Sequence, residues 1–156
     1  MNENADREKA DVDDQFRSLM EGLRTTLPGV QVLFAFLLVL PLQAEFTSIS
    51  DTERIAYYVS FFGSAMASVL LIAPSAHQRL RAPVSGMERH SKQHLAIAVN
   101  ITIVGTIIFS IALAAAVFLI SSLTLTDSLA IAATLAVAAV TVWAWFYIPL
   151  VTFERH

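Results

Sequence analysis

The sequence predicts an all-α integral membrane protein: a four-helix bundle of two transmembrane hairpins, preceded by an amphipathic cytoplasmic helix. The first observation is the distribution of charge, because residues 25–44, 55–76, 95–126 and 128–153 contain no Asp, Glu, Lys, Arg or His. The second is the length of these stretches, since about 20 apolar residues of helix cross a hydrocarbon layer of about 30 Å. The third is a mean hydropathy of +0.63, which is too high for an ordinary soluble domain.

Composition excludes several classes of protein. The chain of 156 residues has no cysteine and a formal net charge of -3, so a disulfide scaffold and a basic nucleic-acid-binding surface are excluded. A conventional soluble enzyme is excluded by the hydropathy. We expect no cofactor and no nucleic-acid partner. The expected partners are the lipid bilayer and a homo-oligomer or larger membrane complex.

Two segments are expected before the first span. Residues 1–13 are polar and acidic, and too few large apolar groups are present to offset the entropy of ordering, so a disordered tail is expected. Residues 14–27 are expected to form an amphipathic helix at the membrane surface, because apolar residues recur at three- and four-residue spacing. These residues are Phe16, Leu19, Met20, Leu23 and Leu27. A merely solvated helix is the alternative.

The four-transmembrane-helix domain is expected over residues 28–153. Its spans are expected at about 28–44, 54–74, 95–120 and 127–150. Pro28 suits the first turn of a helix, where its missing N–H costs nothing, and Pro74 marks the end of the second span. An aromatic belt ends the fourth span, where Trp and Tyr suit the membrane interface. The belt consists of Trp143, Trp145, Phe146 and Tyr147.

The basic residues predict the orientation. Nine of the ten Lys and Arg residues lie in the N-terminal segment, in the loop between the second and third spans, or at the C-terminus. Arg54 is the exception, in the loop after the first span. Short cytoplasmic loops carry the excess of Lys and Arg. We therefore expect a multi-pass protein of the cytoplasmic (inner) cell membrane with both termini in the cytoplasm.

The histidines are weak candidates for a metal site. His90 and His94 are four residues apart, which places both imidazoles on one face of a helix, as a divalent metal requires. Glu88 or His77 would be the third ligand. The neighbouring basic residues repel a cation, so interfacial histidines without a metal are expected. No phosphate-binding loop, HExxH motif or Ser/His/acid set occurs in the sequence, and no catalytic residue is predicted.

Polar residues near the cytoplasmic ends of the spans suggest one small pocket. Gln31 and Asn100 are expected at similar depth in the inner leaflet, where their amides can bond to each other. His77 and Tyr147 fall on the same rim, so the four residues are the candidate pocket. The alternative is that neighbouring backbone groups or serines satisfy each amide.

Small residues at four-residue spacing predict the seam along which the helices pack. Small side chains let two backbones approach, and hydroxyls can bond between helices. The seam is expected to consist of Ser60, Gly63, Ser64, Ser68, Thr102, Thr106, Ser110 and Thr134. A conduction path is the alternative, and spans without ionisable groups favour the seam.

Two runs of the sequence resemble a known family. One reads Gly-Val-Gln-Val-Leu-Phe-Ala-Phe-Leu-Leu from Gly29, and the other reads Ala-Pro-Ser-Ala-His-Gln-Arg from Ala73. They are similar to runs in an uncharacterised family of small actinobacterial four-helix membrane proteins, and the resemblance extends over about residues 20–151. It implies an integral membrane protein of unknown activity. Some members of that family carry a sodium:proton antiporter label.

The functional expectation is a non-enzymatic membrane protein that acts as an oligomeric or accessory component of a membrane assembly. Its basis is the polar-poor spans, the small-residue seam and the charged face at one end. A small secondary transporter, or cation:proton antiporter, is the alternative. An enzyme with a metal bound at His90 and His94 is the third hypothesis.

Overall fold

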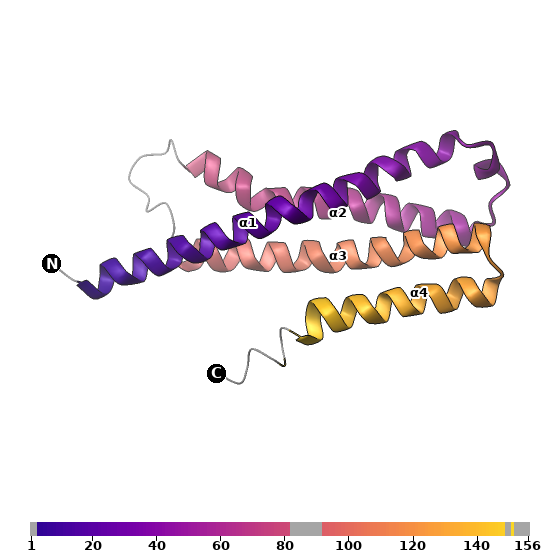
Figure 1. The fold of residues 1–156 in the computed structure, drawn as a ribbon. Coiled ribbons are helices and arrows are strands. Elements are labelled where there is room, and N and C mark those ends of the chain that lie inside the picture. Colours follow the sequence, from indigo (N-terminus) through magenta and orange to yellow (C-terminus); the bar gives the residue numbers. More distant parts are fainter. Residues whose placement is uncertain (1–2, 82–91, 149–150, 152–156) are drawn as a thin grey trace.

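The computed structural model describes residues 3–81, 92–148 and 151, and apart from short turns this part of the chain is helical (Figure 1). The elements are α1 (Glu3–Val39), the 3₁₀ turns η1 (Leu40–Leu42) and η2 (Ala44–Ser48), α2 (Asp51–Arg81), α3 (Lys92–Thr124), α4 (Asp127–Val142) and the π-helical turn η3 (Trp143–Tyr147). The prediction of an all-α fold is confirmed for these residues.

Four helices in the described part are long and apolar enough to cross a membrane, as predicted. They are Asp6–Leu42, Asp51–Leu80, Lys92–Thr124 and Asp127–Tyr147. The first three extend beyond the expected spans, because polar residues at their ends continue the same helix. The α-helical part of α1, in contrast, ends at Val39, and Pro41 lies in the 3₁₀ turn that follows.

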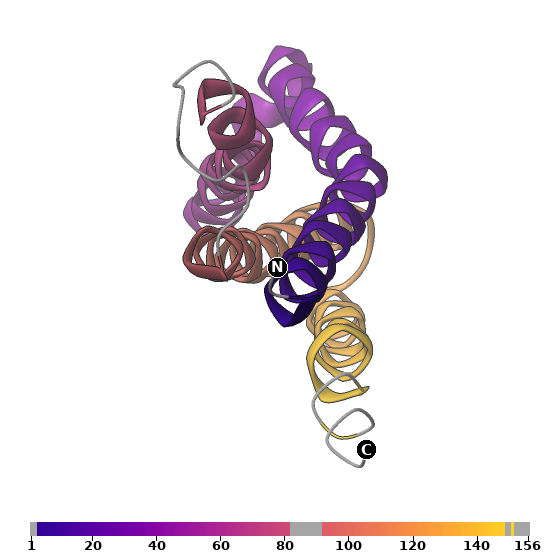
Figure 2. The ribbon, with the colours of Figure 1, turned by 90° about the vertical axis from the view of Figure 1, so that its left-hand side faces the viewer.

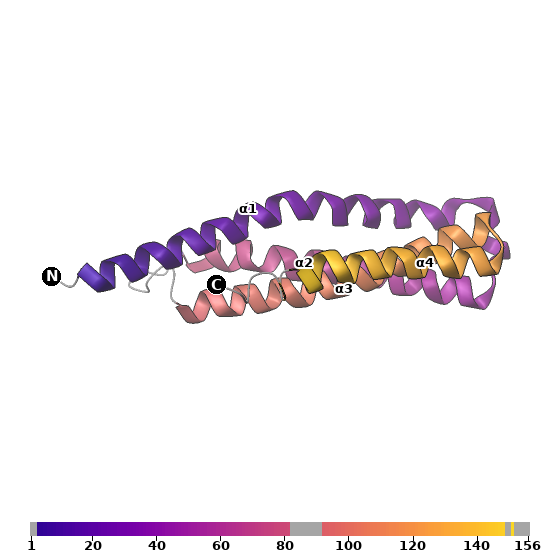
Figure 3. The same cartoon turned by 60° about the horizontal axis from the view of Figure 1, so that its bottom comes forward.

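α1 is one continuous helix of 37 residues, whereas separate segments were expected before Pro28. Residues 3–13 are helical, so the expectation of a disordered tail there is wrong. Residues 14–27 form part of the same helix as the first span and do not form a separate surface helix. Pro28 lies inside α1, where it removes one backbone hydrogen bond. Figure 3 shows that α1 changes direction along its length, as helices do at proline.

A seven-residue repeat of buried side chains explains why α1 continues through this change in composition. Phe16, Leu23, Val30 and Leu37 are all buried, and a spacing of seven keeps them on one face of the helix. The first two lie in the charged half of α1 and the last two in the apolar half. The apolar stripe expected to lie on the membrane surface is therefore part of the face that packs against the rest of the protein.

α3 is the central helix of the described fold. It contacts α1, α2 and α4, and its broadest interface is with α2. Within the described residues α4 contacts α3 but neither α1 nor α2. Figure 2, seen along the helices, shows α1, α2 and α3 grouped together with α4 at one side. The arrangement is a group of three helices with a fourth attached to α3 alone, whereas a four-helix bundle of two transmembrane hairpins was expected.

Two clusters of buried apolar residues form the core. One contains Leu23, Val30, Ala67, Leu71 and Phe109. The other contains Leu37, Ala56, Tyr57 and Leu119. Both clusters join α1, α2 and α3, so the core belongs to these three helices.

α4 ends well before the N-terminal end of α3, while α1 and α2 extend alongside α3 beyond that point (Figures 1 and 3). Trp145, near the end of the fourth helix, stacks on Phe109 of α3 with ring centroids 6.1 Å apart. The part of α3 that precedes Phe109 therefore lies largely beyond the end of α4, beside the charged half of α1.

Candidate functional site

The interface between α2 and α3 is closed by small side chains. A Cβ added to Gly63 would lie 2.9 Å from the Cβ of Ala112, and a Cβ added to Gly105 would lie 3.0 Å from Cδ2 of Leu71. At Gly63 the added Cβ requires a shift, whereas at Gly105 the end of the Leu71 side chain would have to move by a few tenths of an ångström. The two backbones approach closely because glycine and alanine permit it. We call the interface around Gly63, Leu71, Gly105 and Ala112 the α2–α3 seam.

Most of the hydroxyl residues predicted to pack the helices bond within their own helices, whereas the buried Ser60 hydroxyl has no hydrogen-bond partner among the described residues. Ser60 and Ser64 are buried. The partly buried members are Ser68, Thr102, Thr106, Ser110 and Thr134. Thr106 donates to the carbonyl of Thr102 at 2.9 Å, and Ser110 donates to the carbonyl of Thr106 at 2.8 Å. In the described part of the chain none of these hydroxyls bonds to another helix, so they act in packing through their small size.

The four residues expected to share a rim pocket lie apart. Gln31, His77, Asn100 and Tyr147 are all exposed, and none of the cavities described below is lined by more than one of them.

The register of α1 against α3 explains why Gln31 and Asn100 do not meet. Phe16 stacks on His94, and Val30 belongs to the same core cluster as Phe109. Gln31 is therefore almost level with Phe109 and lies about 15 Å further along the bundle than Asn100, at 1.5 Å per residue. The expectation of similar depth came from taking Pro28 as the start of the span.

His77 and His94, near the end of α2 and the start of α3, do not form a metal site with other described residues. The described residues contain no group of three or more His, Cys, Asp or Glu side chains that could hold a metal ion. His94 is buried and stacks on Phe16 with ring centroids 5.5 Å apart, and its ring centroid is 6.5 Å from that of His77. His90, the second weak candidate, lies outside the described residues, as does Glu88. His94 contributes to the packing of α1 against α3.

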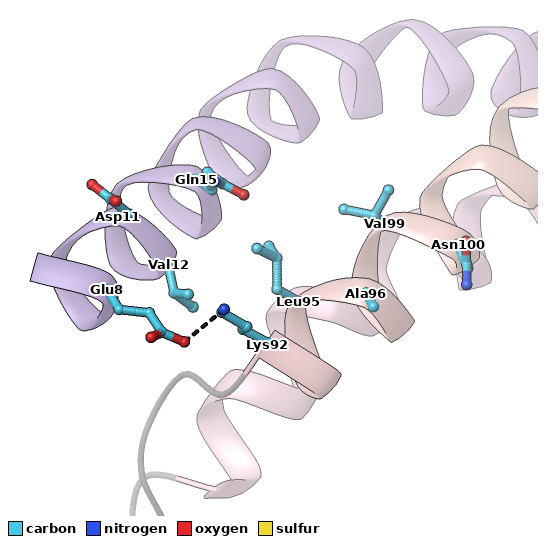
Figure 4. Close-up of a pocket in the computed structure, with 9 residues that line it drawn as sticks. All are labelled: Glu8, Asp11, Val12, Gln15, Lys92, Leu95, Ala96, Val99 and Asn100. Atoms are coloured by element: carbon cyan, nitrogen blue, oxygen red, sulfur yellow. Dashed lines mark ion pairs between the residues drawn. The ribbon is translucent and has the colours of Figure 1, made fainter. Parts of the chain in front are cut away.

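A groove separates the charged half of α1 from the N-terminal half of α3. Its outer part has a volume of about 520 Å³. It is lined by Glu8, Asp11, Val12 and Gln15 of α1 and by Lys92, Leu95, Ala96, Val99 and Asn100 of α3. Figure 4 shows Val12, Leu95 and Val99 projecting into the space between the two helices.

A second cavity, of about 540 Å³, extends the groove towards the middle of the molecule. It shares Gln15 and Val99 with the first, so the two cavities are adjacent. It is also lined by Ser18, Gly22, Thr25, Thr26 and Thr102, among others. We call the combined feature, from Glu8 to Thr26 on α1 and from Lys92 to Thr106 on α3, the α1–α3 groove. Along α1 it measures about 27 Å at 1.5 Å per residue.

The two walls of the α1–α3 groove differ in chemistry. The α1 wall is acidic and polar through Glu8, Asp11 and Gln15, while Leu95 and Val99 make the facing α3 wall aliphatic near its start. Such a pairing suits an amphipathic segment, whose apolar face would lie on α3 and whose polar face would lie on α1.

One ion pair crosses the outer end of the groove. Glu8 Oε1 lies 2.6 Å from Lys92 Nζ, and both side chains are exposed (Figure 4). The hydrogen bond from Lys92, and then its charge, hold the pKa of Glu8 below its ordinary value. Glu8 lies outside the charge-free stretches, so this pair is exposed to water and has little effect on stability.

The opposite end of the molecule carries a polar cluster around Glu53, just before the charge-free stretch of α2. The Glu53 carboxylate accepts hydrogen bonds from the backbone N–H of Ser50 at 2.7 Å and from its hydroxyl at 2.8 Å. These bonds lower the pKa of Glu53, with a smaller contribution from the Ser122 hydroxyl. The Ser50 hydroxyl in turn accepts from the Glu53 N–H, which makes a capping box at the start of α2.

Glu53 also lines two cavities at this end, of about 290 and 530 Å³, together with Ser122. Because Ser50 already bonds both the carboxylate and the backbone of Glu53, the arrangement is explained as a helix cap.

The sequence alone did not predict the α1–α3 groove. The α1–α3 groove depends on residues 8–15, which were assigned to a disordered tail and a surface helix. The available signal was the repeat of Phe16, Leu23, Val30 and Leu37, which crosses Pro28 without a change of phase. It shows that one face of α1 is buried along the whole helix, so the acidic residues beside that face must lie near α3.

The model of a family of unknown function, DUF6328, matches residues 4–149. No curated protein and no solved structure matches the chain. The match covers all four helices, and the expectation of a family with unknown activity agrees with it.

Proposed function

The chain belongs to this family of unknown function, and we propose that it is a non-enzymatic, membrane-embedded component that assembles with itself or with other proteins. The observation that carries the proposal is the unequal length of the helices. α1, α2 and α3 extend beyond the end of α4 as a three-helix unit, and the α1–α3 groove opens on that unit.

The length of α4 places the bilayer in this proposal. Asp127–Tyr147 has 21 residues, which matches a hydrocarbon layer of about 30 Å. Trp143 and Trp145 then lie near one interface, as aromatic residues of membrane proteins do. Beyond this layer α1 and α2 carry polar residues, whereas α3 carries exposed apolar residues such as Ile97 and Ile103, and the buried repeat on α1 joins this three-helix unit to the membrane-embedded part.

The proposed location is the cytoplasmic membrane, with the three-helix unit and both termini in the cytoplasm. Support comes from Arg17, Arg79 and Lys92, which lie near the end of the described fold where α1 and α3 begin and α2 ends, and from Arg24 further along α1. Reporter proteins fused to each terminus test the orientation. A signal from the outer side for either terminus would contradict it.

The assembly proposal is tested by quantitative cross-linking of the full chain in its native membrane. We expect adducts heavier than the single chain, either a multiple of its 17.1 kDa or a second protein. A chain lacking residues 3–13 serves as a control, because it removes part of the three-helix unit and leaves the apolar stretches intact. A single-chain product under every condition would overturn the proposal.

The alternative of a cation:proton antiporter lacks a supporting observation. The charge-free stretches hold no carboxylate or histidine that could carry a proton. The hydroxyls that bond in the seam bond their own helices. A pH-sensitive dye inside vesicles is the direct test, and the accessory proposal expects no cation-driven signal above that of empty vesicles.

A further inference from the structure

We propose that the α1–α3 groove is the docking site for a basic amphipathic helix of a partner protein. The inference rests on the proposed function and adds the chemical class of the partner and the surface that receives it. The groove is about 27 Å long at 1.5 Å per residue, so it accommodates about 18 residues of helix. At its outer end the groove has an acidic and polar wall on α1 and the aliphatic Leu95 and Val99 on α3, which match the two faces of such a helix.

The charge of the groove determines which charge the partner helix carries. Residues 3–14 of α1 contain six acidic and two basic residues, and the two acids that line the groove are Glu8 and Asp11. Lys92 pairs with Glu8, which leaves Asp11 as the charge available at the rim. A helix with Lys or Arg on one face complements this wall, and an acidic helix is repelled by it.

The aliphatic wall supplies the contact area. Val99 lines the groove and is 36% exposed, while Ile103, one turn further along α3, is 47% exposed and lines neither cavity. Because the fourth helix reaches α3 only as far as the level of Phe109 and Trp145, it does not cover this part of α3. A partner helix that covers Leu95 and Val99 removes aliphatic surface from water, which favours binding.

A second copy of the chain does not fit the same groove. Two copies in one membrane share the same orientation, and a two-fold dimer through this face sets α1 parallel to its equivalent. The acidic N-terminal ends then lie side by side, and like charges repel. An anionic lipid surface is disfavoured for the same reason. The partner of opposite charge is therefore the occupant that the geometry supports.

The test uses the full chain in phosphatidylcholine nanodiscs and a fluorescent peptide of about 18 residues, which matches the groove length at 1.5 Å per residue. The peptide consists of Leu and Lys, with Leu at helical three- and four-residue spacing, and binding is measured by anisotropy above that of empty nanodiscs. The same pattern with Glu in place of Lys is the control peptide. We expect saturable binding of the Lys peptide alone.

Matched variants locate the binding. Asp11→Lys is expected to weaken binding by about tenfold, because a like charge then faces the peptide. Asp14→Lys, an exposed position on the same helix outside the groove lining, is expected to leave it unchanged. On the other wall Val99→Asn is expected to weaken binding more than Ile103→Asn. Equal effects of Asp11→Lys and Asp14→Lys, or no binding of the Lys peptide, would overturn the inference.

A photoreactive residue at position 99 identifies which segment occupies the α1–α3 groove. Cross-linking to the Lys peptide supports the proposal. Cross-linking instead to a second copy, or to residues 152–156 of the same chain, would assign the groove to that segment and overturn it. If native-membrane cross-linking still yields adducts in that case, the proposed function stands and only the docking site is wrong.

Discussion

α3 meets its two neighbours of the core in different ways. Its contact with α2 is close, since a Cβ added to Gly63 or Gly105 would lie 2.9 or 3.0 Å from a side chain of the other helix. Its contact with the charged half of α1 is open, and a groove remains between them. The contacts that join the two helices there include the stacking of Phe16 on His94 and the ion pair of Glu8 with Lys92. The first interface is suited to stability and the second to binding.

Phe16→Ala is expected to have the largest effect, because a few side chains hold the open interface together. Phe16 is 1% exposed, and removing a buried Phe side chain costs about 3–5 kcal/mol. The loss is confined to the N-terminal end, so the amides of residues 3–20 exchange faster with solvent while those of the seam do not. Phe36→Ala, at a residue 49% exposed, is the control. Equal exchange in both variants would show that α1 is not anchored through Phe16.

Gly63→Ala tests the closed seam. The added methyl meets Ala112 at 2.9 Å, and overpacking costs about 1–3 kcal/mol, which exceeds the gain of about 0.5–1 kcal/mol in helix propensity. Unfolding in detergent should therefore occur at lower denaturant concentration. Gly22→Ala, where nothing lies within 4 Å of the added methyl, should be neutral or stabilising. A stabilised Gly63→Ala variant would mean that the helices are less close than described.

Tyr57→Phe tests the end of the core furthest from the groove. The buried Tyr57 hydroxyl donates to the carbonyl of Leu37 at 3.1 Å, joining α2 to α1. Losing this bond costs about 0.5–1.5 kcal/mol of unfolding free energy. Tyr58→Phe, at a residue 49% exposed, is the matched control and should change less. The groove should be unaffected, so the Lys peptide should bind the Tyr57→Phe variant as it binds the wild type.

Acidification gives the smallest expected effect, at the cap of α2. The hydrogen bonds from Ser50 lower the pKa of Glu53 in the folded protein. A lowered pKa means that the stabilisation is present above the unfolded pKa of about 4.5 and is lost as the pH falls through the folded pKa. Thermal unfolding of wild type and Glu53→Gln should differ near neutral pH and converge in acid. A difference that grows on acidification would contradict the cap.

The membrane helices were predictable because their signal is local. A stretch of about 20 residues without charge indicates a span whatever surrounds it, and four such stretches correspond to four helices. The ends of α1 were not predictable in the same way. The local sequence placed the start of the first span at Pro28. In the structure the packing of Phe16 and Leu23 against α2 and α3 keeps the helix continuous through that residue.

The candidate site was less predictable than the spans, because it depends on how two helices align. The pairing of Gln31 with Asn100 assumed that both spans begin at the same depth. The described register of Phe16 with His94 and of Val30 with Phe109 separates them. The spacing of small residues predicts Gly63 and Ser64 as packing residues, but the position of Ala112 opposite Gly63 depends on how α2 and α3 align, which the spacing within one helix does not determine.

Photo-cross-linking in the native membrane from position 99 tests the central claim most directly. Val99 lies in the open groove, and Leu135 on α4, which is 64% exposed, provides the comparison position in the apolar part of the chain. We predict that position 99 yields adducts with a second protein whose contacting segment is a basic amphipathic helix, while position 135 yields adducts with lipid. Lipid adducts alone at position 99 would contradict the account.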